Sequence, residues 1–269
     1  MAVRNQTPSA TAAAAPSRGE RVKSADRVMA VLDLVAERGA LPFSEISEAL
    51  ALPKSSAHSL LRTMEARGYL SIDDERHYRL GSRIWELAQA FHEVDDLRTL
   101  MKPLMDEVVE RTGETVQLAT LEGVSAVYLA LSESPHPMKL TSRAGARLPA
   151  YTSAIGKSLL AELDPAEAAR RLDGAQLDKL TDHTIVSVPA LLEELERTRE
   201  RGYGVDDEEF AVGLRCLAVP IRDLDGKAVA AISVSMPTPR YSRAAASNAR
   251  AALAEAAEEA TAVLGRWQG

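Results

Sequence analysis

The stretch SEISEALALPKSSAHSLLRTMEARGYLSI, residues 44–72, decides the fold of the first part of the chain. Ser44 can cap a short helix that ends near Leu50, and Ala51-Leu52-Pro53 then forms a tight break. From Lys54 to Arg67 the apolar residues recur at the spacing of an α-helix. This second helix therefore has one apolar face, made by Ala57, Leu60, Leu61 and Met64.

The segments on either side complete a small domain. Residues 24–38 predict an amphipathic helix that stops at Gly39 and has apolar positions at Val28, Val31, Leu32 and Val35. Apolar and polar residues alternate on either side of residues 73–76, with apolar positions at Leu70, Ile72, Tyr78 and Leu80. This pattern predicts a β-hairpin with a turn at 73–76. Helix, short helix, tight turn, helix and hairpin follow one another in the order of a winged helix-turn-helix.

In that fold the helix after the turn enters the major groove of DNA. Its expected outward positions are all polar and none is acidic: Lys54, Ser55, Ser56, His58, Ser59 and Arg62. In the hairpin, three basic side chains are placed to reach phosphates or a minor groove, namely Arg76, His77 and Arg79. We therefore predict contacts with double-stranded DNA. The alternative is that this polar face is only solvated.

The charge of the chain is divided unevenly between its two parts. The 269 residues include 32 basic and 39 acidic side chains, a net charge of −7. Residues 1–83 hold 12 basic and 10 acidic residues and residues 84–269 hold 20 and 29, so the parts carry +2 and −9. This asymmetry indicates two parts with different partners. One cysteine and no long apolar stretch predict a cytoplasmic protein without an internal disulfide or a membrane span.

The rest of the chain mixes helices and strands. Residues 1–20, rich in Ala, Ser, Thr and Pro, predict a disordered tail with no signal peptide. Helical spacing over 82–97 and 101–113 predicts a connector and a helix that opens a second domain. Further patterns predict strands near 115–121, 124–131, 138–142, 214–221 and 229–235, and helices near 154–162 and 242–265. We expect an α+β chain whose second domain has a mainly antiparallel sheet.

Two polar segments of this second part are candidate sites. Gly156-Lys157-Ser158 is not a phosphate-binding loop, because Tyr151 stands where that motif needs a glycine. The loop 150–154 opens a helix, and its free N–H groups can meet either a carboxylate or water. Asp206-Asp207-Glu208-Glu209 is either a solvated acidic turn or the source of a carboxylate that accepts from a ligand hydroxyl.

An enzyme is the rival interpretation, with Cys216 as its nucleophile. Cys216 lies in an apolar run, where a lone cysteine usually behaves as a small buried hydrophobe, and Ser233 and Ser235 share one face of a later strand. A nucleophile needs a nearby base, and no cysteine-protease arrangement or metal-ligand spacing is formed by His58, His77, His92, His136 and His183. We therefore predict no enzyme, no catalytic residue, no metal and no cofactor.

The run from Ser24 to Arg83, SADRVMAVLDLVAERGALPFSEISEALALPKSSAHSLLRTMEARGYLSIDDERHYRLGSR, resembles the DNA-binding head of the IclR-family transcriptional regulators. GARLPAYTSAIGKSLLAEL at 145–163, RGYGVDDEEFAVGLRCLAVPIRD at 201–223 and AAISVSMP at 230–237 resemble the body of the same family, so the likeness covers about residues 22–265. The resemblance implies a winged helix-turn-helix over 21–82, a linker helix over 83–98 and a GAF-like effector-binding domain over 99–269.

The same resemblance implies how such a regulator works. The head binds an operator, the body binds a small organic acid, and the chain associates as dimers or tetramers. The implied effector contacts are backbone donors at Ala154, Ile155 and Gly156 and pocket side chains at Asp206, Cys216, Ser233 and Ser235. The family often has an arginine where this chain has Ser59 and a histidine where it has Tyr151, so operator sequence and effector identity are expected to depend on these two positions.

Overall fold

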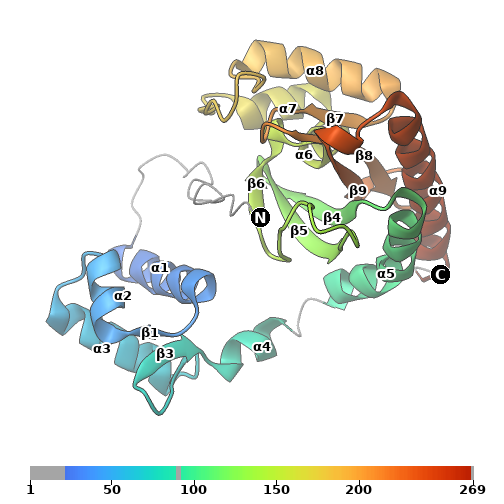
Figure 1. Cartoon of the computed structure of the whole chain (residues 1–269). Helices are drawn as coiled ribbons and strands as arrows, with labels where there is room; N and C mark the ends of the chain where they lie inside the picture. Colours follow the sequence, from blue (N-terminus) through green and yellow to red (C-terminus); the bar gives the residue numbers. More distant parts are fainter. Residues whose placement is uncertain (1–21, 89–91, 268–269) are drawn as a thin grey trace. The chain divides into compact units, whose positions relative to one another are not determined.

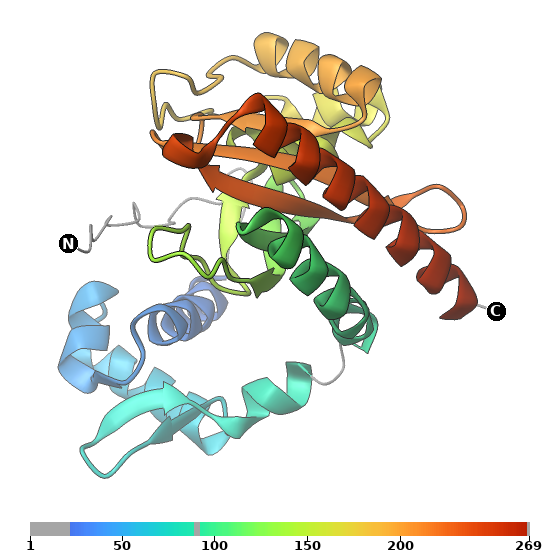
Figure 2. The same ribbon diagram turned by 45° about the vertical axis from the view of Figure 1, so that its right-hand side comes forward.

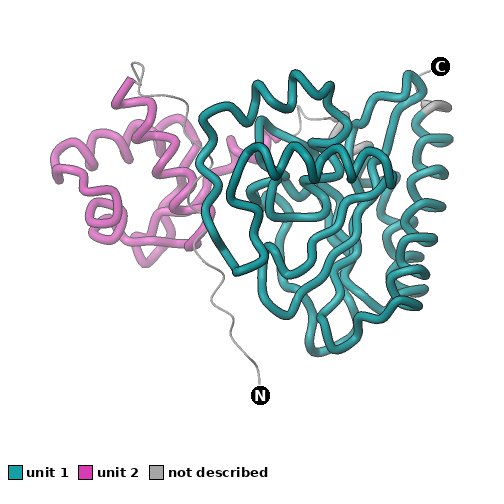
Figure 3. The backbone as a smooth tube through the Cα atoms, turned by 90° about the horizontal axis from the view of Figure 1, so that it is seen from above, with its two compact units in different colours: residues 1–15, 94–269 teal, residues 16–93 magenta. Residues whose placement is uncertain are grey.

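A computed structural model describes residues 22–88 and 92–267. The chain forms two compact units, and the boundary between them in the sequence lies between residues 93 and 94 (Figure 3). The disordered tail predicted for residues 1–20 lies outside the described residues. In the described ranges, no helix has the length and apolar character needed to cross a membrane.

The N-terminal unit is a winged helix-turn-helix (Figure 1). Its elements are α1 (Lys23–Arg38), β1 (Leu41–Pro42), α2 (Phe43–Ala49), α3 (Lys54–Ala66), β2 (Leu70–Ile72), β3 (His77–Leu80) and α4 (Ser82–Ala88). The three strands form an antiparallel sheet in the order β1-β3-β2. Its core joins α1, α2, α3 and the sheet through Val31, Leu34, Val35, Leu41, Ile46, Leu61, Met64 and Leu70.

The predicted helices and hairpin of this unit are confirmed, with three differences. Ser44 lies inside α2 rather than capping it, because the helix already begins at Phe43 and no side chain bonds its first turn. The short strand β1 was not predicted. Of the linker helix predicted over 83–98, residues 89–91 lie outside the described residues, and no helix ends at residue 98, because α5 (His92–Thr112) continues through that position.

The C-terminal unit is built on one antiparallel sheet in the order β6-β5-β4-β9-β8-β7. After α5, its elements are β4 (Thr115–Glu122), β5 (Ser125–Ser132), β6 (Arg147–Pro149), the 3-10 turn η1 (Ala150–Thr152), α6 (Ala154–Ala161), α7 (Pro165–Leu172), α8 (Val188–Arg201), β7 (Gly204–Asp207), β8 (Leu214–Arg222), β9 (Ala228–Pro237), η2 (Thr238–Arg240) and α9 (Arg243–Trp267).

Helices cover both faces of this sheet (Figures 1 and 2). α5 and α9 pack on one face, where Met101 and Leu253 join the apolar residues of β4, β8 and β9. α6 packs on the other face through Ile155 and Leu159. α7 and α8 lie outside α6 and form a further apolar cluster with it. The face covered by α6 is the one that carries the polar residues of the candidate site.

The predicted antiparallel sheet is confirmed, although one strand was misplaced. Residues 138–142 have no regular structure, and the strand next to β5 is β6 instead. The helices α7 and α8 and the strand β7 were not predicted. β7 escapes sequence analysis because its buried positions are held by Gly204 and Asp206, which are typical of turns.

Candidate functional site

The outer face of α3 is fully polar and faces solvent. Every outward position predicted from the sequence is exposed, that is Lys54, Ser55, Ser56, His58, Ser59 and Arg62. The opposite face buries Ala57, Leu61 and Met64 completely. The first turn of α3 contains no acidic residue and no side chain caps it, so its free N–H groups and positive dipole end remain open to an anion.

A groove beside this face extends the candidate interface onto α1. The groove has a volume of about 320 Å³ and lies between the start of α1 and the middle of α3. Its walls are Ser24, Arg27, Leu52, Ser56, Ser59, Leu60 and Thr63. Arg27, Lys54 and Arg62 have no ion-pair partner among the described residues. The sequence contains no local signal for Ser24 and Arg27, because only the packing of α1 brings them near α3.

The hairpin turn is organised by Asp73. Its Oδ1 accepts hydrogen bonds from the N–H groups of Glu75 and His77, at 3.1 and 2.8 Å, and its Oδ2 pairs with Arg79 at 2.7 Å. The hydrogen bond from His77 and the charge of Arg79 hold the pKa of Asp73 below its ordinary value. Arg79 is exposed yet paired, whereas Arg76 at the turn is exposed and has no ion-pair partner among the described residues.

The C-terminal unit contains a small cavity lined by the start of α6. Its volume is only about 10 Å³, close to the minimum for one water molecule. The lining residues come from five strands, α6 and its N-cap residue, and two loops: Tyr128, Leu140, Leu148, Ser153, Ala154, Ile155, Asp206, Phe210, Leu214, Cys216, Ser233 and Ser235. Of the seven effector contacts predicted from the sequence, all but Gly156 line this cavity.

Strand register explains why distant polar residues meet there. Asp206 on β7 pairs with Cys216 on β8, and Cys216 pairs with Ser235 on β9. Ser233 lies two positions before Ser235 and therefore shares its face. Gln117 on β4 accepts a hydrogen bond from Ser233 Oγ at 2.9 Å and donates to Ser235 Oγ at 3.0 Å. Gln117 is completely buried and was not predicted as part of the site.

Asp206 is the most unusual residue of the cavity. Its residue surface is 1% exposed, and its Oδ1 accepts from the N–H groups of Glu209 and Phe210 at 2.8 and 3.3 Å. Its Oδ2 is buried without a hydrogen-bond partner. Burial raises the pKa of this carboxyl to about 7, with a smaller contribution from the nearby charge of Glu209. The solvated turn considered for residues 206–209 is therefore wrong for Asp206 and Glu209, which are both buried.

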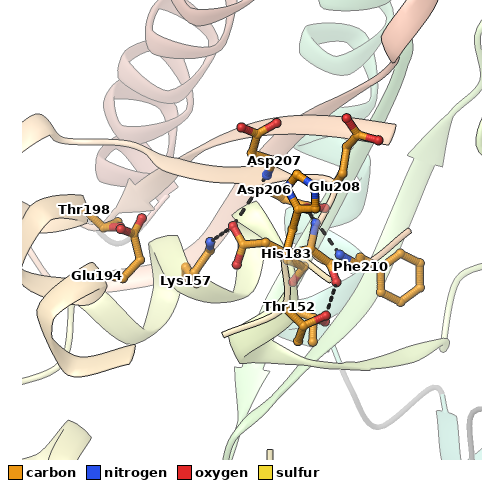
Figure 4. A network of polar contacts seen from close by, with 12 residues as sticks. Thr152, Lys157, His183, Glu194, Thr198, Asp206, Asp207, Glu208 and Phe210 are labelled. Carbon is orange, nitrogen blue, oxygen red and sulfur yellow. Dashed lines mark hydrogen bonds and ion pairs between the residues drawn. The ribbon is translucent and has the colours of Figure 1, made fainter. Parts of the chain in front are cut away.

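A buried ion pair stands beside Asp206 (Figure 4). Lys157 of α6 is completely buried and donates to Glu209. Burial raises the pKa of Glu209, and its Oε2 has no hydrogen-bond partner. The backbone of the same loop is held by hydroxyls of the preceding segment, since Thr181 donates to the carbonyl of Glu208 at 2.7 Å and Thr184 to that of Glu209 at 2.8 Å.

The start of α6 presents two free donors to the cavity. The N–H groups of Ala154 and Ile155 have no acceptor among the described residues. The N–H of Gly156 differs from the prediction, because it donates to Ser153 Oγ at 3.1 Å. Gly156 instead allows close packing, since a Cβ there would lie 2.3 Å from the carbonyl oxygen of Ala150. Tyr151 turns away from the cavity and donates to the carbonyl of Asp178 at 2.9 Å.

Cys216 does not have the surroundings of a nucleophile. Burial and the neighbouring Asp206 hold its pKa well above the ordinary value, so the side chain is a thiol and not the reactive thiolate. Its Sγ lies 3.3 Å from Ser235 Oγ. Across the described ranges, no group of three His, Cys, Asp or Glu side chains is arranged to hold a metal ion.

Comparison with known proteins gives a family match for each of the two units. Residues 24–74 match the IclR helix-turn-helix domain, and residues 89–262 match the family described as bacterial transcriptional regulator IclR C-terminal. The chain is 37% identical over 246 residues to the regulator XynR of Escherichia coli, covering 91% of this chain and 98% of the relative. It is 33% identical over 257 residues to the transcriptional repressor IclR of the same organism, covering 94% and 93%.

A solved structure adds a bound ligand to the comparison. An IclR homolog from Microbacterium hydrocarbonoxydans, crystallised in complex with 4-hydroxybenzoate, superposes with a TM-score of 0.78 at 29% identity and covers 90% of this chain and 98% of that one. These relatives are transcriptional regulators and not enzymes, in agreement with the prediction from the sequence. The chain belongs to the IclR family of bacterial transcriptional regulators.

Proposed function

We propose that this regulator binds an operator through the outer face of α3 and that an organic acid in the C-terminal cavity changes its affinity for DNA. The observation that carries the DNA-binding half is the exposed face of α3, which has six polar positions and no acidic one. Lys54, Ser55, Ser56, His58, Ser59 and Arg62 would contact base edges and phosphates in the major groove. Arg76 and Arg79 of the hairpin would contact the flanking backbone.

The groove between α1 and α3 supports a wider contact with the DNA backbone. Arg27 and the hydroxyls of Ser24 and Thr63 line it beside Ser56 and Ser59. A guanidinium together with hydroxyl groups suits a phosphate, which accepts several hydrogen bonds and carries negative charge.

The cavity supports the effector half of the proposal. It combines the free N–H groups of Ala154 and Ile155, the hydroxyls of Ser233 and Ser235, and the unpaired carboxyl oxygen of Asp206. The N–H groups are donors that suit a carboxylate, and a relative of similar fold was crystallised in complex with 4-hydroxybenzoate, an aromatic acid. Cys216 supplies a neutral wall.

The size of the cavity explains how binding can be coupled to a conformational change. A volume of about 10 Å³ cannot hold an organic acid, so lining side chains such as Phe210 and Leu140 must move before one binds. A ligand that binds only the enlarged state shifts the protein toward that state. We propose that the connecting segment of α4 and α5 carries this shift to the head.

Self-association is the second part of the proposed assembly. Large apolar side chains are exposed on α1 and α4, namely Met29 at 64%, Trp85 at 66% and Leu87 at 41%. A second copy that covered them would remove this apolar surface from water and place two recognition helices on a palindromic operator. The proposed site of action is the cytoplasm, where the chromosome lies.

Binding of DNA tests the first half of the proposal directly. Arg62→Ala should weaken binding to the DNA upstream of the gene by about 1–3 kcal/mol. The logarithm of the binding constant should also fall less steeply with the logarithm of the salt concentration, by the amount expected for about one phosphate contact. Arg38→Ala is the matched control, because Arg38 is an exposed arginine in the last turn of α1, at the opposite end of the helix from Ser24. If both variants bind as the wild type does, the assigned DNA interface is wrong.

A further inference from the structure

We propose that Asp206 enters the effector complex as the neutral acid and donates a hydrogen bond from Oδ2 to an oxygen of the ligand. The cavity would then take up an acidic ligand together with one proton from solvent. This inference rests on the proposed effector site, and it assigns Asp206 the role of a donor. The ligand class that follows is an acid that places an acceptor oxygen, rather than a hydroxyl hydrogen, against Asp206.

The two oxygens of Asp206 have different environments. Oδ1 faces the loop and accepts two backbone N–H groups, from Glu209 and Phe210. Oδ2 lies on a buried residue that lines the cavity, and it has no partner. A buried acceptor without a donor is costly, and an ionised one more so. A proton on Oδ2 removes the excess charge and supplies a donor to which an acceptor oxygen inside the cavity can bind.

The charged neighbours of Asp206 leave its own charge unbalanced. Lys157 of α6 is the nearby cation, and it is bound to Glu209. Glu209 itself carries a second carboxyl close to Asp206. From β8 and β5 the cavity presents only a thiol and a phenol, Cys216 and Tyr128, and burial raises the pKa of both, so both stay neutral. An anionic ligand would therefore meet an uncompensated negative charge unless Asp206 is protonated.

The other charged groups near the loop are paired or exposed, and Glu194 of α8, the second carboxylate near Lys157, pairs with Arg197 and Arg201. His183, in the segment that packs behind the loop, is exposed to solvent. Asp207 points outward and pairs with Arg215 at 2.6 Å. The remaining polar side chains of the wall are hydroxyls: Ser233 and Ser235 are bonded to Gln117, and Ser153 accepts from the N–H of Gly156. Because burial raises the pKa of Asp206 to about 7, the proton is available near neutral pH and becomes scarce above it.

Calorimetry on the full-length protein tests the proton directly. The probes are aliphatic and aromatic monocarboxylates, including benzoate and 4-hydroxybenzoate. Titration in two buffers of different ionisation enthalpy at pH 8 should show uptake of close to one proton per ligand. From the pKa of about 7, the dissociation constant should rise about 25-fold between pH 6.5 and pH 8.5. No proton uptake together with a change below about twofold would overturn the inference.

Two variants separate this role from simple loss of the site. Asp206→Asn keeps the shape and carries a permanent donor, so it should bind the same acid with little dependence on pH. Asp207→Asn is the matched control on the exposed neighbour and should keep the wild-type dependence. If Asp206→Asn does not bind the acid, and the dissociation constant of the wild type does not change with pH, the ionised carboxylate itself is needed and the inference is wrong. If no acid of the panel binds at either pH, the effector half of the proposed function fails instead.

Discussion

Removal of Lys157 alone should destabilise the C-terminal unit strongly. Its side chain is 1% exposed and that of Glu209 10%, so Lys157→Met leaves a carboxylate in the interior without its cation. Breaking a buried ion pair from one side costs about 3–5 kcal/mol, because the remaining charge has lost its partner and is still without water. Glu209 Oε2 already has no hydrogen-bond partner, so few contacts are available to compensate.

Urea unfolding followed by hydrogen exchange in β8 and β9 peptides measures this loss in the C-terminal unit alone. The double variant Lys157→Met/Glu209→Leu removes both charges and should recover most of the lost stability. Lys179→Met is the matched control, since Lys179 and Asp182 form an ion pair with side chains 58% and 93% exposed. That change should cost less than about 1 kcal/mol. Equal effects of Lys157→Met and Lys179→Met would refute the reasoning.

Two further changes test the packing and titration of the cavity. Because burial raises the pKa of Asp206 from 3.8 to about 7, its contribution to stability is complete below about pH 4 and is lost as the pH rises toward 7. Asp206→Asn has no carboxyl to ionise, so its free energy of unfolding in urea, relative to that of the wild type, should rise by up to about 4 kcal/mol between pH 4 and pH 8. If the difference in the free energy of unfolding between variant and wild type does not change with pH, this reasoning is wrong. Gly156→Ala should lower the melting temperature, because its Cβ would lie 2.3 Å from the carbonyl oxygen of Ala150. An unchanged melting temperature would show that the helix moves there without cost.

The head could be predicted almost completely from its sequence. Its helices and hairpin have regular apolar periods, and the expected inward residues Ala57, Leu61 and Met64 are all buried. Local patterns suffice there because each element buries one face against near neighbours. Ser44 was misplaced because the same serine is compatible with a cap or with the first turn.

The cavity could be predicted only in part, because contacts between distant residues decide it. Lys157 carries no local sign of burial, since its partner Glu209 is 52 residues away. Gln117 donates a hydrogen bond to Ser235, which is 118 residues further along the chain, and no pattern in the sequence of β4 indicates this contact with β9. Asp206 was named through resemblance to a family, whereas its unpaired oxygen and raised pKa emerge only from the packed structure.

The central claim is that an acid bound in the C-terminal unit changes the affinity of the head for DNA. The full-length protein is titrated into labelled upstream DNA, with and without saturating acid, and binding is followed by fluorescence anisotropy. The two curves give the dissociation constant for DNA of the acid-bound and of the acid-free protein. We predict saturable, salt-dependent binding whose dissociation constant changes by about 5- to 150-fold when the acid is present, as for a coupling of about 1–3 kcal/mol. Identical binding curves with an acid that calorimetry shows to be bound would contradict the account.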